Sequence, residues 1–189
     1  MPSYDYTIFD AAVPPDARPA GTQGVLGYVG GRATHVWRPA EWLPFRVVRQ
    51  FPAWVADLSA DPRHQADAAV AAVKALGWAA YEPEPERRAI IYDMETAADP
   101  AFYAVLASVT DLAGFVAVAY GSLSTVLQCA AADVLAAEWD DKAKIPAGQT
   151  IHGKQYKANV PLGGTEVDYS IIDAWLYQRG GQGARHQPK

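Results

Sequence analysis

The stretch Arg88-Ala-Ile-Ile-Tyr-Asp-Met-Glu-Thr96 decides the fold that we infer for this chain. Its apolar run Ile90-Ile91-Tyr92 predicts a buried strand. Because successive side chains of a strand point to opposite faces, Asp93 and Glu95 point the same way at its carboxyl end. In a barrel of alternating strands and helices, that end carries the chemistry. The alternative interpretation is a strand end with two solvated acids.

Composition limits the classes of protein that the chain can belong to. It has 189 residues, of which half are apolar and a fifth charged, as expected for one globular domain. The formal net charge of −5 argues against non-specific nucleic-acid binding, which needs positive charge. Cys129 is the single cysteine, so an internal disulfide and a thiolate metal cluster are both excluded.

The N-terminal residues 1–7 have neither the basic start nor the apolar segment of a signal peptide. No apolar run approaches the length of a membrane span. We therefore expect a protein made in the cytoplasm, which something else releases to the cell wall or assembles into a larger particle if it acts elsewhere.

Alternating strand and helix patterns predict an α/β fold, a TIM-like (β/α) barrel with some helices missing. Asp61-Pro62 and Asp99-Pro100 each place a capping aspartate before a proline, which predicts two helix starts. The predicted strands lie at residues 6–10, 24–29, 46–51, within 88–96, and at 115–120, 134–138, 151–157 and 167–172.

The end of the chain departs from this alternation. Residues 158–166 are too few for a parallel crossover, so the last two strands are predicted to form a C-terminal β-hairpin. We expect a single barrel domain over residues 1–178 and a flexible tail over 179–189, which is rich in Gly, Gln and basic residues.

The hairpin has a consequence for the acidic residues. An antiparallel last strand begins at the end of the barrel where the parallel strands finish, and a closed barrel places it beside the first strand. Four carboxyl groups are then expected at one mouth, those of Asp10, Asp93, Glu95 and Asp168.

Carboxyl groups without a histidine or cysteine partner fit two chemistries. One is glycoside hydrolysis, in which one carboxyl donates a proton and another faces the developing positive charge. The other is a Mg²⁺ or Ca²⁺ site for phosphate chemistry. Aromatic residues expected near the mouth favour sugar, since their flat apolar faces have polar rims; they are Tyr92, Tyr120, Trp139 and Tyr156. No cofactor or resident metal is expected.

Residues 32–45 combine aromatic and basic side chains in what reads as a long loop, among them Arg32, Trp37 and Trp42. Such a segment could form one wall of a sugar-binding cleft or pack as a lid on the core, and both interpretations stay open.

Several short motifs, in this order, resemble those of the lysozyme-type glycoside hydrolases of family 25. They resemble still more the uncharacterised glycoside-hydrolase-like domain of bacteria and phages. The resemblance runs from Asp10 to Ile172. The motifs are Ile8-Phe9-Asp10, Tyr92-Asp-Met-Glu95, Ala119-Tyr-Gly-Ser122, Ala137-Glu-Trp139, Lys154-Gln-Tyr156 and Val167-Asp-Tyr-Ser170.

The resemblance implies a muramidase-like enzyme acting on peptidoglycan or another N-acetylated glycan. Glu95 would be the proton donor, and Asp93 would assist the acetamido group or stabilise positive charge. Asp10 and Asp168 would shape the site, while Gln155 and the aromatic residues named above would bind substrate. The serine and aromatic residue that usually follow the first aspartate are replaced by Ala11 and Ala12. This departure leaves open a weakly active or inactive module that binds glycan or serves as a structural part of a phage virion.

Overall fold

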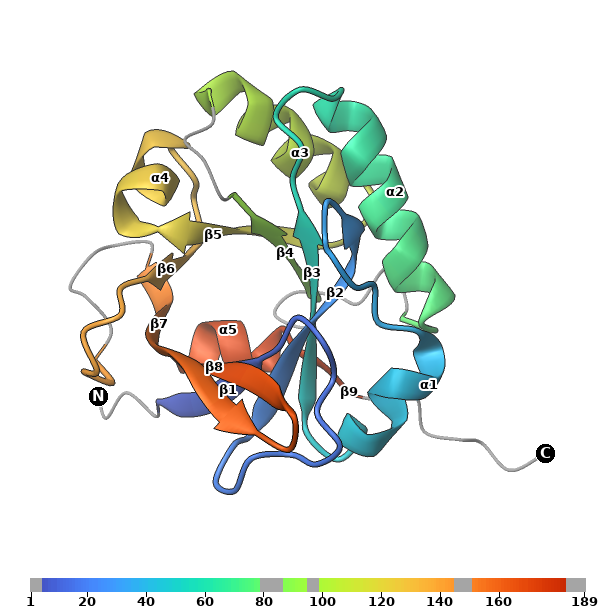
Figure 1. The fold of residues 1–189 in the computed structure, drawn as a ribbon. Helices are drawn as coiled ribbons and strands as arrows, with labels where there is room; N and C mark the ends of the chain where they lie inside the picture. Colours follow the sequence, from blue (N-terminus) through green and yellow to red (C-terminus); the bar gives the residue numbers. More distant parts are fainter. Residues whose placement is uncertain (1–4, 79–86, 95–98, 145–150, 183–189) are drawn as a thin grey trace.

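The computed structural model describes residues 5–78, 87–94, 99–144 and 151–182, which form a closed eight-stranded barrel with helices around it (Figure 1). Neighbouring strands from β1 to β7 run parallel, whereas β8 is antiparallel to both β7 and β1. The α/β barrel and its C-terminal hairpin are therefore confirmed. The strands are β1 (Tyr6–Asp10), β2 (Gly24–Gly31), β3 (Arg49–Val55), β4 (Ala89–Asp93), β5 (Val116–Ser122), β6 (Val134–Ala137), β7 (Ile151–Leu162) and β8 (Thr165–Ile172).

The helices are distributed unevenly around the barrel. Figure 1 shows α2 and α3 side by side on the outside of β3 to β5, while α5 closes one end. Asp61 and Asp99 cap α2 and α3 by accepting backbone N–H bonds, each followed by proline, as predicted. The helical segments are α1 (Pro39–Trp42), the 3₁₀ turn η1 (Leu43–Phe45), α2 (Pro62–Ala75), α3 (Pro100–Leu112), α4 (Leu123–Gln128) and α5 (Ala174–Gln178).

Strand alternation divides the apolar residues into two cores. Inside the barrel, Ile8, Phe51 and Ile91 belong to one buried apolar cluster. Leu176 of α5 packs in the same cluster, at the end of the barrel that α5 closes. Residues one position along, such as Phe9 and Ile90, face the helices and form the outer core. The interior is thus apolar at the amino end of the parallel strands, which leaves the polar side chains at the carboxyl end.

The predicted third strand was placed too early. Residues 43–45 form a 3₁₀ turn, and β3 runs from Arg49 to Val55 with Pro52 inside it. Proline lacks a backbone donor, so Pro52 predicts the end of a strand, but it lies inside β3. Because β3 pairs with β2 on one side and β4 on the other, the remaining ladder bonds hold it in the sheet.

The predicted tail also begins too early, because the barrel continues to residue 182. Arg179 is buried with its guanidinium 3.8 Å from the Trp175 ring, and its carbonyl accepts the Ala89 N–H. The short strand β9 (Gly181–Gln182) then pairs with β3. A glycine-rich segment predicts a flexible tail, but here glycine allows close packing. A Cβ on Gly181 would lie 2.3 Å from the Trp78 ring. Residues 183–189 lie outside the described part of the chain.

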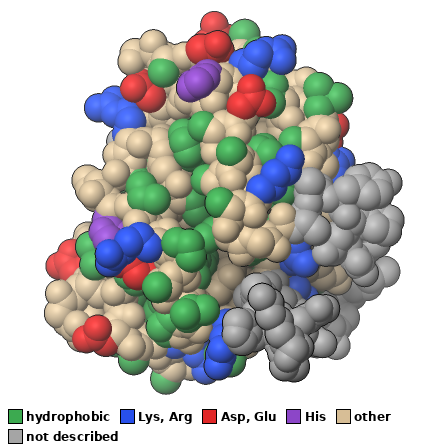
Figure 2. Space-filling view, turned by 90° about the vertical axis from the view of Figure 1, so that its right-hand side faces the viewer, with side chains coloured by type: hydrophobic (Ala, Val, Ile, Leu, Met, Phe, Trp, Pro, Cys, Tyr) green, Lys and Arg blue, Asp and Glu red, His purple; other side chains and the backbone are tan. Residues whose placement is uncertain are grey.

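One face of the molecule carries charged side chains of both signs (Figure 2). Figure 2 shows charged side chains of both signs scattered among apolar ones on the face that carries α1 and α2. Among the described residues, no helix is long and apolar enough to cross a membrane.

A partly buried ionic bridge joins β6, β7 and β8 at the end of the barrel opposite the mouth. His152 at the start of β7 contacts Asp133 through Nε2 and Asp173 through Nδ1, both at 2.9 Å, and its ring stacks on Trp175. Burial opposes a charge on His152, but the two aspartates outweigh it and raise its pKa from 6.5 to about 9. The imidazolium therefore stabilises the base of the barrel.

We expect His152→Gln to lose a pH-dependent part of the stability. A raised pKa stabilises the fold fully below pH 6.5, and the contribution disappears as pH rises through 9. The difference in unfolding free energy between wild type and variant should shrink by about 2 kcal/mol between pH 6 and 9.5, as measured by urea denaturation. His64→Gln, at an exposed histidine of α2, is the control. A difference that does not change with pH would contradict the bridge.

Candidate active site

Three of the predicted carboxyl residues meet at the carboxyl end of the barrel. Asp10 ends β1 and Asp93 ends β4, and both are less than a tenth exposed. Asp168 on the inverted β8 is the register partner of Asp10. The antiparallel last strand therefore brings an acid from the start of β8 against an acid from the end of β1, as predicted. Glu95 lies outside the described residues.

Gln155 of β7 connects the acids to the rim. Its side chain is wholly buried, and its Nε2 donates to Asp10 Oδ2 at 3.1 Å and to Asp168 Oδ2 at 3.0 Å. Its Oε1 accepts a 2.6 Å hydrogen bond from Nε1 of Trp139. One amide thus links two carboxyl groups to an indole that is 69% exposed.

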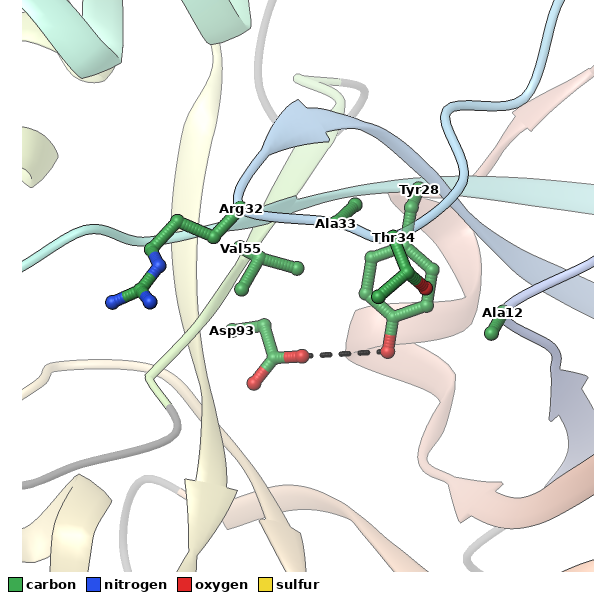
Figure 3. Close-up of a pocket in the computed structure, with 7 residues that line it drawn as sticks. All are labelled: Ala12, Tyr28, Arg32, Ala33, Thr34, Val55 and Asp93. Carbon is green, nitrogen blue, oxygen red and sulfur yellow. Dashed lines mark hydrogen bonds between the residues drawn. The ribbon is translucent and has the colours of Figure 1, made fainter.

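Tyr28 of β2 is a site residue that the sequence interpretation missed. Its hydroxyl donates to Asp93 Oδ2 at 3.3 Å (Figure 3). Tyr28 lies two residues after Leu26, an inner-core residue, so strand alternation alone would have placed it in the mouth.

The electrostatics of the mouth favour a protonated Asp10. Burial, followed by the charge of Asp168 and more weakly that of Asp93, raises the pKa of Asp10 from 3.8 to about 8, although the Gln155 bond opposes the shift. Burial likewise raises the pKa of Asp168, with a contribution from Glu166. At neutral pH, Asp10 therefore holds a proton while it lies beside other acids.

A pocket of about 140 Å³ opens beside Asp93. Figure 3 shows the Tyr28 hydroxyl turned toward Asp93, while the guanidinium of Arg32 points away from the tyrosine. Small side chains make up much of the remaining wall. The lining residues are Ala12, Tyr28, Arg32, Ala33, Thr34, Val55 and Asp93.

Residues 32–45 contribute to both of the structures considered for them. Arg32 and Thr34 line the pocket, whereas Trp37 and Trp42 are buried in the outer core. In the turn that precedes them, the backbone of Gly31 lies close to the backbone of Val55 in β3. Gly31 has φ +74°, and a Cβ there would lie 1.9 Å from the Val55 carbonyl oxygen, so only glycine fits.

The aromatic residues predicted to bind substrate separate into two groups. Tyr120 is buried in the inner core. Burial raises the pKa of Tyr120, and the charge of nearby Asp10 raises it further. Trp139 lies on the rim and is exposed. Tyr92 faces the opposite way: it is wholly buried under α3 and contacts Thr110 Oγ1 at 2.6 Å.

Tyr156 also lies away from the mouth. It lines an open hollow outside the hairpin, which it shares with Tyr169. The placements of Tyr92 and Tyr156 in the mouth are wrong for one reason. Each is adjacent in its strand to an inward-facing residue, Asp93 or Gln155, so each must face outward.

In the described part of the chain, which does not include Glu95, no three His, Cys, Asp or Glu side chains form a group that could hold a metal ion. Oδ2 of Asp10 and Oδ2 of Asp168 both accept from the Gln155 amide.

Comparison with known proteins supports the fold alone. No protein-family model matches the chain, and no curated protein matches it. A solved structure with the same fold is the 1.07 Å crystal structure of an uncharacterized B. stearothermophilus protein. The two chains are 15% identical over 93% of this chain and all of the other, with a TM-score of 0.72.

We expect Asp10→Asn to stabilise the protein at neutral pH. An acid whose pKa is raised in the folded state lowers the stability as pH rises from about 4, where the unfolded chain ionises, to about 8. Asparagine keeps an acceptor for Gln155 without this cost. The gain should be roughly 1.4 kcal/mol for each pH unit in that range, as an upper bound, measured by urea denaturation at pH 4.5 and 7.5.

The control is Asp67→Asn, at an exposed acid of α2, which should change stability little at either pH. An Asp10→Asn protein that is destabilised equally at both pH values would show that Asp10 is ionised in the folded state.

Proposed function

We propose that the chain is a glycoside hydrolase that acts on cell-wall glycan by a carboxylate acid/base mechanism, as a lysozyme or muramidase does. The observation that carries the proposal is the convergence of Asp10, Asp93 and Asp168 at one mouth, beside the exposed ring of Trp139. We also propose that the barrel is a reduced TIM-like (β/α) barrel, whose hairpin replaces the last parallel strand.

The arrangement suits cleavage of a glycosidic bond. In the proposed reaction Glu95 donates a proton to the leaving oxygen as the C–O bond breaks. A water molecule then supplies the hydroxyl of the new reducing end, and the proton that it loses restores the acid form of Glu95. Asp93, oriented by Tyr28, faces the positive charge that develops on the sugar. Asp10 and Asp168 hold Gln155 in place and shape the floor of the site.

The lining of the mouth supports a sugar as the ligand. Carboxylate and amide oxygens accept hydrogen bonds from hydroxyl and acetamido groups, and the flat ring of Trp139 offers an apolar face. We propose peptidoglycan or another N-acetylated glycan as the substrate class. The protein would then act on the cell wall after release, or as a component of a virion.

A second candidate is a module on the same barrel that binds glycan, or serves a structural role, without cleaving it. The small volume of the pocket beside Asp93 favours this alternative, because about 140 Å³ accommodates a substituent more readily than a chain of sugars. The hydrogen bonds that already engage one oxygen each of Asp10 and Asp168 with Gln155 also favour it.

Release of reducing ends from purified peptidoglycan separates the two candidates. Glu95→Gln should lower the rate by at least about 100-fold, the usual contribution of a general acid, and Asp93→Asn should lower it as well. Asp67→Asn, an exposed acid on α2, should keep full activity.

Two outcomes would contradict the enzyme proposal. Full activity of a folded Glu95→Gln protein would remove the role assigned to Glu95. A wild-type protein that binds peptidoglycan but releases no reducing ends would establish the binding module instead.

A further inference from the structure

Trp139 is an exposed residue whose indole nitrogen is hydrogen-bonded to a buried side chain. All six tryptophans lie in the described part of the chain, and Trp139 is the exposed member of the set, at 69%. Its Nε1–H is nevertheless committed to a 2.6 Å bond to Gln155. A large apolar ring kept in water in one orientation is a surface built to contact something.

The backbone on both sides of the ring is anchored to β7. Glu138 N–H donates to the Gln155 carbonyl at 2.9 Å, and Asp141 N–H donates to the Tyr156 carbonyl at 3.0 Å. Buried Lys154 reinforces the segment through a 2.7 Å bond to Asp140. The segment that carries Trp139 therefore has main-chain bonds before and after the ring.

The orientation of the Gln155 amide is dictated by the carboxyl pair. Both hydrogens of Nε2 are used, one for Asp10 and one for Asp168. Rotating the amide by 180° would turn its oxygen toward two carboxyl groups and leave the indole N–H facing a donor. The oxygen must consequently point toward the rim, where Trp139 is the group that bonds to it.

We infer that Gln155 is a positioning residue that fixes the Trp139 ring as a sugar-stacking platform and couples its orientation to the ionisation of Asp10 and Asp168. The sugar rests on the proposed function, whereas the coupling is a property of the free protein. Ionisation of the pair strengthens the bonds that the amide donates, and this polarises its oxygen into a better acceptor for the indole.

The groups that surround this chain of bonds come from every neighbouring strand. Tyr28 and Tyr120 face the carboxyl pair, and burial raises the pKa of both well above 10, so they stay neutral in the range of interest. Other charged groups described near the pair or the ring are Asp93 of β4, Glu166 of β8, and Glu138, Asp140, Asp141, Lys142 and Lys154 close to Trp139.

Tryptophan indole resonances in ¹H–¹⁵N spectra test the coupling without any ligand. The Trp139 resonance is assigned by its loss in Trp139→Phe. Between pH 6 and 10 we expect it to move downfield with a midpoint near 8, and we expect Asp10→Asn to abolish this movement. A Trp139 resonance that stays constant, or that titrates unchanged in Asp10→Asn, would overturn the inference.

Trp175 provides an internal control in the same spectra. Its ring stacks on His152 at the other end of the barrel, with centroids 3.8 Å apart, so its resonance should follow His152 near pH 9 in both proteins. Gln155→Met should leave the Trp139 indole in fast exchange with water and without titration. Gln155 is buried, so Gln155→Met could fail to fold. In that case Trp139→Phe replaces it as the test variant, because phenylalanine keeps an aromatic face but removes the N–H.

Binding of an N-acetylglucosamine oligosaccharide, followed by calorimetry at pH 7 and 9, then tests the platform. We expect Trp139→Phe to bind about 5-fold more weakly, the equivalent of one hydrogen bond, and to lose the pH dependence of wild type. Equal, pH-independent affinities of the two proteins would overturn the positioning role. If the Trp139 resonance titrates as expected but wild type binds no glycan, the coupling stands and the proposed function fails.

Discussion

The antiparallel pairing of β8 with β1 is the constraint on which the rest of the structure depends. It closes the barrel, and in the same register it sets Asp168 against Asp10. Two acids in that position repel each other unless a proton or a donor intervenes, and the structure uses both. Asp10 keeps its proton near neutral pH, and Gln155 places one amide hydrogen on each carboxyl group. The inverted β8 thus brings the two acids together, and its neighbour β7 supplies the Gln155 amide that stabilises them.

A parallel eighth strand would have had a different result. The carboxyl end of such a strand would present the residues near Ile172 to the mouth, and Asp168 would lie deeper in the barrel. Because the strand is inverted, Ile172 instead packs in the inner core with Ile8 and Leu26. The short hairpin between β7 and β8 is therefore the sequence feature with the largest consequence for the site, since it decides which end of β8 is polar.

Much of the fold and part of the site could be predicted from the sequence because both depend on local patterns. Capped helix starts and apolar strands fix the order of elements, and the hairpin length placed Asp168 correctly beside Asp10. The prediction that Tyr92 lies in the mouth is wrong because Tyr92 is adjacent to Asp93 in β4, and neighbouring side chains of a strand face opposite sides. The burial of Arg179 and Gly181 depends on contacts with distant residues such as Trp78, which no local pattern records.

Two pH-sensitive groups are linked by β7: Asp10 of β1, which contacts Gln155, and His152 near the start of the strand. The buried acid of Asp10 lowers stability as pH rises toward 8. The His152 bridge to Asp133 and Asp173 contributes its full stability only below about pH 6.5, and that contribution declines steadily as pH rises from there to about 9. Between about pH 6.5 and 8 the two groups therefore act in the same direction, because each contributes less stability as pH rises. Since Gln155 and His152 both belong to β7, this one strand carries the contacts of both pH-sensitive groups.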